Sequence, residues 1–494
     1  MKYLKLIFLL LCIQSFSQNV SLRWSDKMKT NGSEVIVGGK NGNYYTRNTT
    51  KDNNLVFKTF DEKAVLKKEV DANFKLADIE YQYIKNYFLG KDIIHLLSEH
   101  KRKKKTFSIY ASKTNKDFVP IEETMVLSEV NYKEMVKYGV RISPDSTKIV
   151  VWTELQGKKK SKPNSIQYKI FDAKLKNVLN EKTVVLPHNA EDMEVYNCHL
   201  DDYQNFYVNS EVTKPKKEQK KEESETYTNV IVYGKNDEVK NIVYEYKNKM
   251  IDSFYLNITK DNTLICTGFL SPIIKGFLKS KKRELVSDEL FIVKNDCKTF
   301  AEKQNKVISV SALYPDKVSK VSEYVPFKVR EVHELKDGSV SIVAEQYKAV
   351  YHSGYQGNGY YVYFYCDIAV INLDNKSEVK GMVKIPKFQK DVKNPSLLTT
   401  TYKGKTYVVY EDETKNDNVN TDKDIKKSTT SIFSRDTNNS LFLVTVNAKG
   451  EMKKEIIYSY DKSDIRSDFN KCVVIKDGEI MLNANDYIGI FKIK

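Results

Sequence analysis

The sequence predicts an all-β protein whose small sheets form a closed ring of about seven blades, a β-propeller. Short strands in which apolar and polar residues alternate run through the whole chain, and turns of Asn, Asp, Gly and Lys separate them. One pattern, a polar turn followed by an apolar strand, recurs along the chain, which is typical of radial or stacked repeats. Each small sheet has two apolar faces that it cannot bury alone, and a ring of neighbouring blades covers both.

The recurring pattern sets the expected number of blades. Its turns begin near Thr30, Leu89, Pro144, Asp201, Lys260, Lys336, Lys403 and Lys476. These recurrences enclose seven intervals, so we expect seven blades, with the carboxy-terminal strand completing a blade that the amino terminus begins; six or eight blades remain open. Two β-sandwich domains are the alternative, but no Pro- or Gly-rich linker divides the chain. A single propeller domain over residues 18–494 is therefore predicted.

The clearest single hairpin lies near the amino terminus. Glu34 to Lys40 and Asn43 to Arg47 alternate like strands, and Asn41-Gly42 between them is a preferred two-residue hairpin turn. The one expected departure from strands is a short helical turn within Ser128 to Tyr138.

The first residues predict export. Two lysines precede an apolar run, Leu6 to Ile13, that is too short to span a bilayer, and small residues precede a cleavage point after Ser17. This is the layout of a cleavable signal peptide over residues 1–17. The residues before Cys12 do not resemble a lipobox, so no lipid is expected, and no later stretch is apolar enough to predict a membrane-spanning helix.

Charge and cysteine content bear on partners and on covalent bridges. The formal net charge is +16, which favours acidic partners, yet the chain is also rich in Lys, Asn, Ile and Tyr together, as an AT-rich coding bias produces. Nucleic acid is a poor candidate outside the cytoplasm, so an acidic envelope surface is the expected target if the charge is used. Five scattered cysteines follow the signal peptide, and they are expected to be buried apolar side chains rather than bridges: Cys198, Cys266, Cys297, Cys366 and Cys472.

Polar and basic insertions interrupt the strand pattern. Lys214 to Glu225 is a charged run and Glu411 to Asn439 is polar, so both are expected to be surface loops. Lys158 to Pro163 is a third such loop. Ser271 to Ser287 mixes apolar and basic residues and is interpreted as a plain loop, with a segment that touches a partner or a membrane as the alternative.

Two stretches resemble known propellers. ISPDSTKIVV, at Ile142 to Val151, resembles a strand motif of TolB-like and WD-repeat-like propellers, in which the Pro-Asp turn leads into a strand near the central channel. Val329 to Pro386 is similar to uncharacterised exported propeller-like proteins of Bacteroidota, through KDGSVSIVAEQY, GYYVYFYCDIAVINLD and VKIPK. The resemblance implies the fold and export, and it implies no particular activity.

The sequence lacks the common catalytic motifs. It contains no G-x-S-x-G nucleophile elbow, no H-E-x-x-H and no EF-hand calcium loop, and His95 and His100 are five apart in a strand and so face opposite sides. No cofactor and no metal site are predicted. Several carboxylates near the expected innermost strands would suit the acid and base chemistry of a propeller glycosidase: Asp92, Asp145, Glu154, Glu345 and Asp412. Each also has a structural interpretation, because Asp stabilises turns and strand ends lie near water.

The most unusual stretch is rich in tyrosine. Tyr347 to Tyr365 is predicted to form a hairpin with three glycines at its tip, and its tyrosines either pack between blades or form an aromatic platform for a sugar or a protein. The candidate binding residues lie in this tip and in the mixed apolar and basic segment: His352, Tyr355, Tyr360, Tyr361, Ile273 and Phe277.

Two functional hypotheses remain. The first is a non-enzymatic binding or scaffold protein of the bacterial cell envelope, in the periplasm or on the cell surface. In its narrower form the chain is a soluble subunit that docks on an outer-membrane secretion machine. The second is a carbohydrate-active enzyme that uses carboxylates of the channel. The rigid ring with broad loop faces and the lack of a catalytic motif favour the first.

Overall fold

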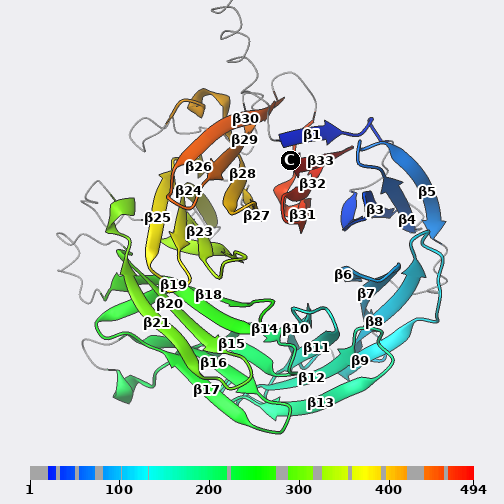
Figure 1. The fold of residues 1–494 in the computed structure, drawn as a ribbon. Coiled ribbons are helices and arrows are strands. Elements are labelled where there is room, and N and C mark those ends of the chain that lie inside the picture. Colours follow the sequence, from blue (N-terminus) through cyan, green and yellow to red (C-terminus); the bar gives the residue numbers. More distant parts are fainter. Residues whose placement is uncertain are drawn as a thin grey trace, which may run out of the picture.

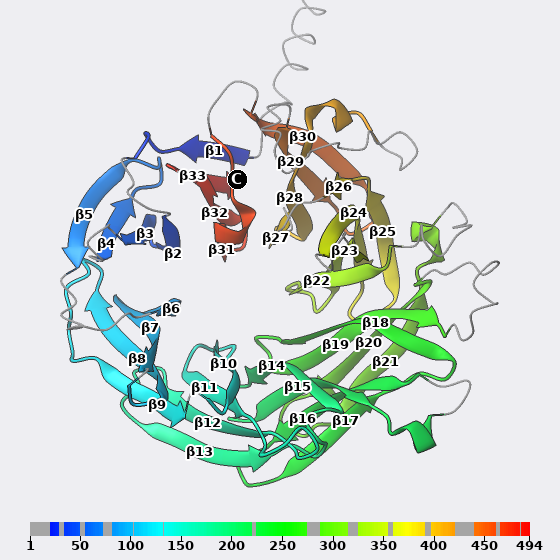
Figure 2. The ribbon, with the colours of Figure 1, turned by 180° about the vertical axis from the view of Figure 1, so that it is seen from behind.

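The computed structural model describes residues 20–28, 34–49, 55–72, 82–101, 103–131, 133–219, 224–273, 287–314, 325–353, 359–390, 397–419, 439–460, 465–484 and 486–494. The predicted signal peptide, residues 1–17, lies outside these ranges. The described residues form eight antiparallel sheets arranged in a ring (Figure 1), and the view from behind shows the same order of blades (Figure 2). The protein is an eight-bladed β-propeller. Within the described ranges, no helix is long and apolar enough to cross a membrane.

Each blade has four main strands, which follow one another from the centre of the ring outward. The innermost strands of blades 1 to 8 are β2 (Val35–Lys40), β6 (Gln82–Leu89), β10 (Met135–Ile142), β14 (Met193–Leu200), β18 (Lys249–Ile258), β22 (Phe327–Glu334), β27 (Leu397–Tyr402) and β31 (Val473–Lys476). The second strands are β3 (Asn43–Thr49), β7 (Asp92–Lys101), β11 (Lys148–Leu155), β15 (Phe206–Thr213), β19 (Thr263–Pro272), β23 (Val340–His352), β28 (Lys405–Glu413) and β32 (Glu479–Ala484).

The third and fourth strands complete the blades in the same order. The third strands are β4 (Leu55–Phe60), β8 (Thr106–Asn115), β12 (Ser165–Asp172), β16 (Thr226–Tyr233), β20 (Glu289–Asp296), β24 (Tyr360–Leu373), β29 (Asn439–Val446) and β33 (Tyr487–Ile493). The outer strands are β5 (Leu66–Ala72), β9 (Met125–Asn131), β13 (Val178–Val185), β17 (Val239–Tyr244), β21 (Glu302–Ser309), β25 (Val379–Ile385), β30 (Met452–Ser459) and β1 (Val20–Trp24). Short 3-10 turns lie in the connections: η1 (Lys216–Glu218), η2 (Ser311–Leu313), η5 (Thr414–Asn416) and η7 (Phe469–Lys471). Blade 6 has a fifth, two-residue strand, β26 (Gln389–Lys390), beside β24.

The predicted count of about seven blades is wrong by one. Each recurrence of the turn-and-strand pattern marks one blade, so counting the intervals between them loses a blade. Seven of the eight turns directly precede a second strand, as the turn near Lys476 precedes β32. The first, near Thr30, precedes the innermost strand β2, and the matching turn of blade 1 is Asn41-Gly42. The pattern therefore leads into the second strand of a blade and not into the strand nearest the centre.

The amino-terminal strand closes the ring. β1 forms the outer edge of blade 8 and pairs antiparallel with β33, from Val20 opposite Ile493 to Trp24 opposite Gly489. The carboxy-terminal strands thus share a blade with the amino terminus, as the sequence suggested. Closure inside one sheet satisfies the backbone groups of an edge that would otherwise be open to other chains.

The apolar core lies between the blades. Alternate residues of β11 show this: Ile149 and Val151 pack in a cluster with blade 2, whereas Val150 and Trp152 pack in a cluster with blade 4. Comparable clusters join every pair of neighbouring blades, including blade 8 with blade 1. The two-fold period of the strands therefore gives each sheet two buried faces, as the repeat pattern predicted. The five predicted cysteines are all buried.

Local predictions have mixed outcomes. Asn41 and Gly42 both have positive φ, 51° and 76°, and join β2 to β3 as the hairpin pattern predicted. The predicted helical turn within 128–138 is wrong, because β9 ends and β10 begins there. The predicted polar loop at 411–439 starts too early, since β28 continues to Glu413 and η5 follows it; residues 420–438 lie outside the described ranges.

The two ends of the ring differ in their connections. In an antiparallel blade, the link from the second to the third strand and the link to the next blade emerge at one end, which we call the long-loop end. The insertions predicted at 158–163, 214–225, 271–287 and 411–439 all join a second strand to a third strand and so emerge there. The opposite end, the turn end, carries short turns such as Lys403-Gly404 between β27 and β28.

Candidate functional site

The tyrosine-rich stretch forms a long hairpin at the long-loop end of blade 6. β23 and β24 have 13 and 14 residues, whereas the other second strands have six to ten. The two strands stay paired up to His352 opposite Tyr360, beyond a bulge between Glu345 and Tyr347. The hairpin therefore extends past the body of the blade, and we call residues 347–365 the tyrosine hairpin.

Five tyrosines share one face of this hairpin because side chains alternate along paired strands. They form a continuous row of ring contacts: Tyr347 with Tyr365 at 5.0 Å between centroids, Tyr347 with Tyr363 at 6.5 Å, Tyr361 with Tyr363 at 6.2 Å, and Tyr351 with Tyr361 at 5.1 Å. On the other face, His352 stacks on Tyr360 at 5.4 Å. The row is buried at its root and open at its tip.

The exposed fraction of each tyrosine side chain distinguishes packing between blades from an aromatic platform. Tyr365 is buried, and burial raises the pKa of its hydroxyl to about 12. Toward the tip, Tyr351, Tyr360 and Tyr361 are 55%, 60% and 56% exposed. The tyrosines therefore pack between blades only at the root of the hairpin. The tip has the geometry of an aromatic platform.

A buried ion network fixes the root of the hairpin. Glu345 is fully buried and accepts a hydrogen bond from Arg330 Nε at 2.9 Å and another from Lys387 Nζ at 2.5 Å. The Arg330 guanidinium also lies 5.5 Å from the ring centroid of Tyr347, and Lys387 Nζ lies 5.9 Å from that of Tyr365. The network therefore ties the innermost strand, the second strand and the connection after β25 to the first tyrosines of the row.

The structure brings some of the predicted binding residues together. His352, Tyr360 and Tyr361 lie side by side near the tip of the tyrosine hairpin. Ile273 follows β19 in the neighbouring blade 5, at the same end of the ring, and its N–H donates to the Asn248 carbonyl at 3.4 Å. Tyr355 and Phe277 lie outside the described residues.

Four of the five candidate carboxylates are held in an ion pair or a tight turn, or are buried away from solvent. Asp92 starts β7 and lies 3.8 Å from Lys113 Nζ. Asp145 lies in a tight turn, where hydrogen bonds from Ser143 and Thr147 hold its pKa below the usual range although burial acts to raise it. The negative charge of Glu345 is compensated by Arg330 and Lys387 in the ion network at the hairpin root. Asp412 is buried at the end of β28. Asp92, Glu345 and Asp412 lie on second strands, which pair with the innermost strands, and Asp145 lies in the turn between the first two strands of blade 3.

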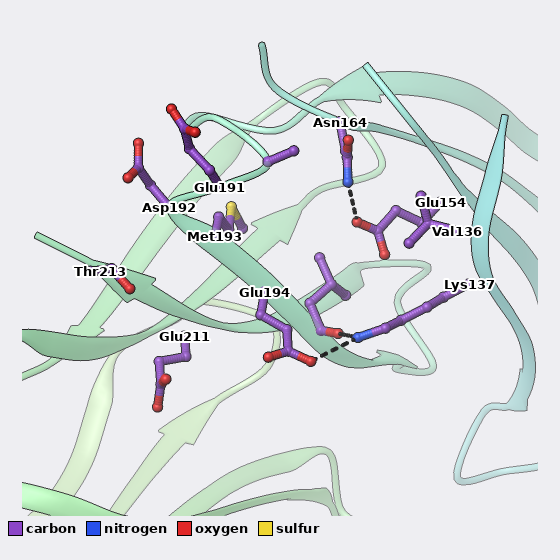
Figure 3. Close-up of a pocket in the computed structure, with 12 residues that line it drawn as sticks. Val136, Lys137, Glu154, Asn164, Glu191, Asp192, Met193, Glu194, Glu211 and Thr213 are labelled. Atoms are coloured by element: carbon purple, nitrogen blue, oxygen red, sulfur yellow. Dashed lines mark hydrogen bonds and ion pairs between the residues drawn. The ribbon is translucent and has the colours of Figure 1, made fainter. Parts of the chain in front are cut away.

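Glu154 differs because it borders a pocket. The pocket has a volume of about 400 Å³ and lies between blades 3 and 4 at the long-loop end (Figure 3). Glu154 is only 2% exposed, and its Oε1 accepts a hydrogen bond from Asn164 Nδ2 at 2.8 Å. Burial raises the pKa of Glu154 above its usual value, and the hydrogen bond from Asn164 partly offsets this effect.

Metal chemistry receives no support from the described part of the chain, where no three His, Cys, Asp or Glu side chains are arranged to hold an ion. His95 and His100 lie on opposite faces of β7 as predicted, the first buried and the second exposed. Sequence reasoning missed Arg330, Lys387 and the residues that line the pocket opposite Glu154. Lys387 left a weak signal, because Lys384 and Lys387 are the two charged residues in the otherwise apolar run from Met382 to Phe388.

Comparison with known proteins identifies no family and no activity for the chain. No protein-family model and no curated protein matches the chain in sequence. Among solved structures, the WD40 domain of SCAP from fission yeast matches with a TM-score of 0.41 and 9% identity over 97% of this chain and 99% of that one. A Pyrococcus horikoshii acylaminoacyl peptidase matches at 0.32 and 9%, over 79% and 59%. A Bacteroides caccae protein of unknown function matches at 0.29 and 9%, over 72% and 94%. These neighbours include both an enzyme and a WD40 domain, and similarities this low do not choose between them.

Proposed function

We propose that the chain is a non-enzymatic binding protein of the bacterial cell envelope and that a protein partner docks on the tyrosine hairpin. The observation that carries the proposal is the row of tyrosines, which is anchored at its root and exposed at its tip. Tyrosine is enriched at protein interfaces, because its large ring buries much area and its hydroxyl finds hydrogen bonds. A hairpin held by a buried ion network presents these rings with little loss of conformational freedom on binding.

The location belongs to the same proposal. The pattern of residues 1–17 supports export, and the net charge of +16 suits a surface rich in acidic groups. In its narrower form, the proposal makes the chain a soluble subunit that docks on an outer-membrane secretion machine. A ring of eight blades suits this role because its long-loop end offers several insertions around one axis.

Partner capture by variants tests the proposal. The tagged protein and a Tyr351→Ala/Tyr361→Ala variant would be used to capture partners from detergent-solubilised envelopes of the source cells. Both side chains are more than half exposed, so the variant should fold normally, as thermal melting would verify. If each truncation costs about 2 kcal/mol, as at interface hot spots, the double variant should lose well over tenfold in affinity for the captured protein.

A matched control separates the hairpin from exposed tyrosines in general. Tyr203 is 42% exposed and lies in a turn of blade 4 at the turn end of the ring. Tyr203→Ala should capture the same partner as fully as the unmodified protein. Equal capture by the hairpin variant, or equal loss with Tyr203→Ala, would contradict the assignment of the site.

Glu154 supports a second candidate function, glycoside hydrolysis. A buried carboxyl with a raised pKa beside a pocket is suited to act as a general acid. This function predicts that Glu154→Gln abolishes turnover of an envelope or dietary polysaccharide while the protein stays folded. It also predicts that the hairpin variant retains turnover, so the two functions give opposite results with the same pair of variants.

A further inference from the structure

Five of the twelve residues that line the pocket between blades 3 and 4 are acidic. Blade 3 contributes Glu154 and Lys137, and the start of blade 4 contributes Glu191, Asp192 and Glu194. Glu211, on the second strand of blade 4, completes the acidic lining. Figure 3 shows Glu154 on the blade 3 side of the pocket and Glu194 on the blade 4 side, whereas the carboxylates of Glu191, Asp192 and Glu211 point away from Glu154.

Glu154 is bonded through only one of its two oxygens. Its Oε1 accepts from Asn164, and Asn164 Oδ1 in turn accepts from the Gly157 N–H at 3.0 Å, so the side chain is held in place. Its Oε2 is buried and has no hydrogen-bond partner among the described residues. A buried carboxylate oxygen without a donor is costly, and a bound donor would remove that cost.

Glu194 and Glu211 make a second unfavourable arrangement. They are direct cross-strand partners on β14 and β15, and both line the pocket. Like charges that face each other across paired strands are destabilising. Lys137 offsets only part of this charge, because its Nζ lies 3.2 Å from Glu194 Oε1 and donates to the Val195 carbonyl at 2.6 Å.

We propose that this pocket binds a primary ammonium or guanidinium group, carried by a small amine or by a lysine or arginine side chain. The cation would donate to the free Oε2 of Glu154 and lie between Glu154 and the Glu194–Glu211 pair. The pocket volume of about 400 Å³ leaves room for the charged group and the methylene chain that carries it. The proposal rests on the pocket alone and does not require a partner on the tyrosine hairpin.

Calorimetric titration tests the proposal with matched probes. Cadaverine and agmatine supply an ammonium and a guanidinium group, whereas 1,5-pentanediol has the length of cadaverine without its charge. Both cations should bind the full-length protein with a dissociation constant of 1 mM or tighter, and the diol should show no binding at 10 mM. An acetylated Gly-Lys-Gly amide serves as the side-chain probe; tighter binding of this peptide than of cadaverine assigns the pocket to a protein side chain, and the reverse assigns it to a free amine.

Two variants locate the binding. Glu154→Gln keeps an oxygen for Asn164 and should weaken cadaverine binding at least tenfold. Glu181→Gln, in the outer strand of the same blade, removes an acidic group that pairs with Lys169 and should leave binding unchanged. If Glu154→Gln does not fold, Glu194→Gln replaces it, because Glu194 is largely exposed, and it too should weaken binding.

Three results would overturn the proposal: no binding of either cation at 10 mM, equal binding of the diol, or full binding by the pocket variants. Each of these outcomes leaves the function proposed for the tyrosine hairpin intact, because that function is judged by capture with Tyr351→Ala/Tyr361→Ala. Loss of capture by those variants, with cadaverine binding retained, would support both sites independently.

Discussion

Replacing Asp412 by asparagine should make the stability of the protein less dependent on pH between pH 5 and pH 8. Asp412 is 2% exposed at the end of β28. Its Oδ1 accepts hydrogen bonds from the Glu413 N–H at 2.8 Å and from Asn416 Nδ2 at 3.2 Å, whereas its buried Oδ2 has no hydrogen-bond partner among the described residues. Burial raises the pKa of Asp412 to about 7, although both hydrogen bonds act to lower it.

The raised pKa of Asp412 gives the sign and the size of the change in folding stability with pH. The folded protein keeps the Asp412 proton up to about pH 7, whereas the unfolded chain loses it near the usual pKa of 3.8. The stability that this proton contributes is fully present below pH 3.8 and is lost as the pH rises through 7. At about 1.4 kcal/mol for each tenfold change in proton affinity, the whole loss is about 4 kcal/mol, and about 3 kcal/mol of it falls between pH 5 and pH 8.

Urea denaturation of the unmodified protein and of Asp412→Asn at several pH values measures this effect. Asparagine keeps an oxygen for both donors and has no proton to lose. The free energy of unfolding of the unmodified protein should therefore fall by about 3 kcal/mol more than that of the variant from pH 5 to pH 8. Free energies that change in parallel would refute the argument, because they would show that Asp412 does not titrate in this range.

Asp61 provides the control for this experiment. A hydrogen bond from Lys67 is the largest cause that lowers the pKa of Asp61 to about 2; burial acts to raise this pKa, and the Val65 and Lys63 N–H groups lower it further. The stability from a lowered pKa is present above the unfolded value and is lost only as the pH falls through 2. Asp61→Asn should therefore follow the unmodified protein in parallel between pH 5 and pH 8.

Three further predictions concern the hairpin root, the ring closure and one loop. Lys387→Met leaves buried Glu345 with Arg330 alone and should lower the free energy of unfolding by about 3–5 kcal/mol in urea denaturation, whereas Lys380→Met, at a partly exposed pair, should change it by less than about 1 kcal/mol. Removing residues 1–24 takes away β1 and exposes the edge of β33, so melting temperature should drop and light scattering should rise relative to a chain that starts at Val20; equal behaviour of the two would contradict closure by β1. Replacing residues 215–224 with a short Gly-Ser turn should leave the melting temperature nearly unchanged, because η1 buries no side chain, and a large drop would show that the loop packs.

The fold could be predicted from the sequence because the residues that determine each turn and strand are close together in the chain. Each blade repeats a polar turn before an apolar second strand, and a period of two is visible within a few residues, as in Lys148 to Leu155. The blade count failed because the intervals between the recurrences were counted, whereas each of the eight recurrences marks one blade.

The candidate sites likewise differ in whether their residues lie in one stretch of sequence or far apart in the chain. The tyrosine hairpin was predicted because all its residues lie within one stretch of sequence, and its exposed tip followed from the glycines. The ion network at its root was not predicted, since Arg330 and Lys387 stand 15 and 42 residues from Glu345 and reach it only through the blade. The pocket at Glu154 was missed for the same reason, because its acidic lining comes from two blades.

The two sites lie at the long-loop end of the ring, and at the turn end the turns of several blades are hydrogen-bonded to one another. The Asp145 N–H donates to Asp202 Oδ1 at 3.0 Å, and Asn262 Nδ2 donates to Asp202 Oδ2 at 2.7 Å, so the turns of blades 3, 4 and 5 hold one another. An insertion in any of these turns would break the bonds of its neighbour. At the other end, the insertion at 158–163 is itself tied to the connection into blade 4, because the Glu191 N–H donates to the Lys160 carbonyl at 3.1 Å and the Ala190 N–H donates to the Lys162 carbonyl at 3.0 Å. A partner of this ring should therefore approach along the axis from the long-loop end, where it would meet the tyrosine hairpin of blade 6 and the acidic pocket of blades 3 and 4 on the same side.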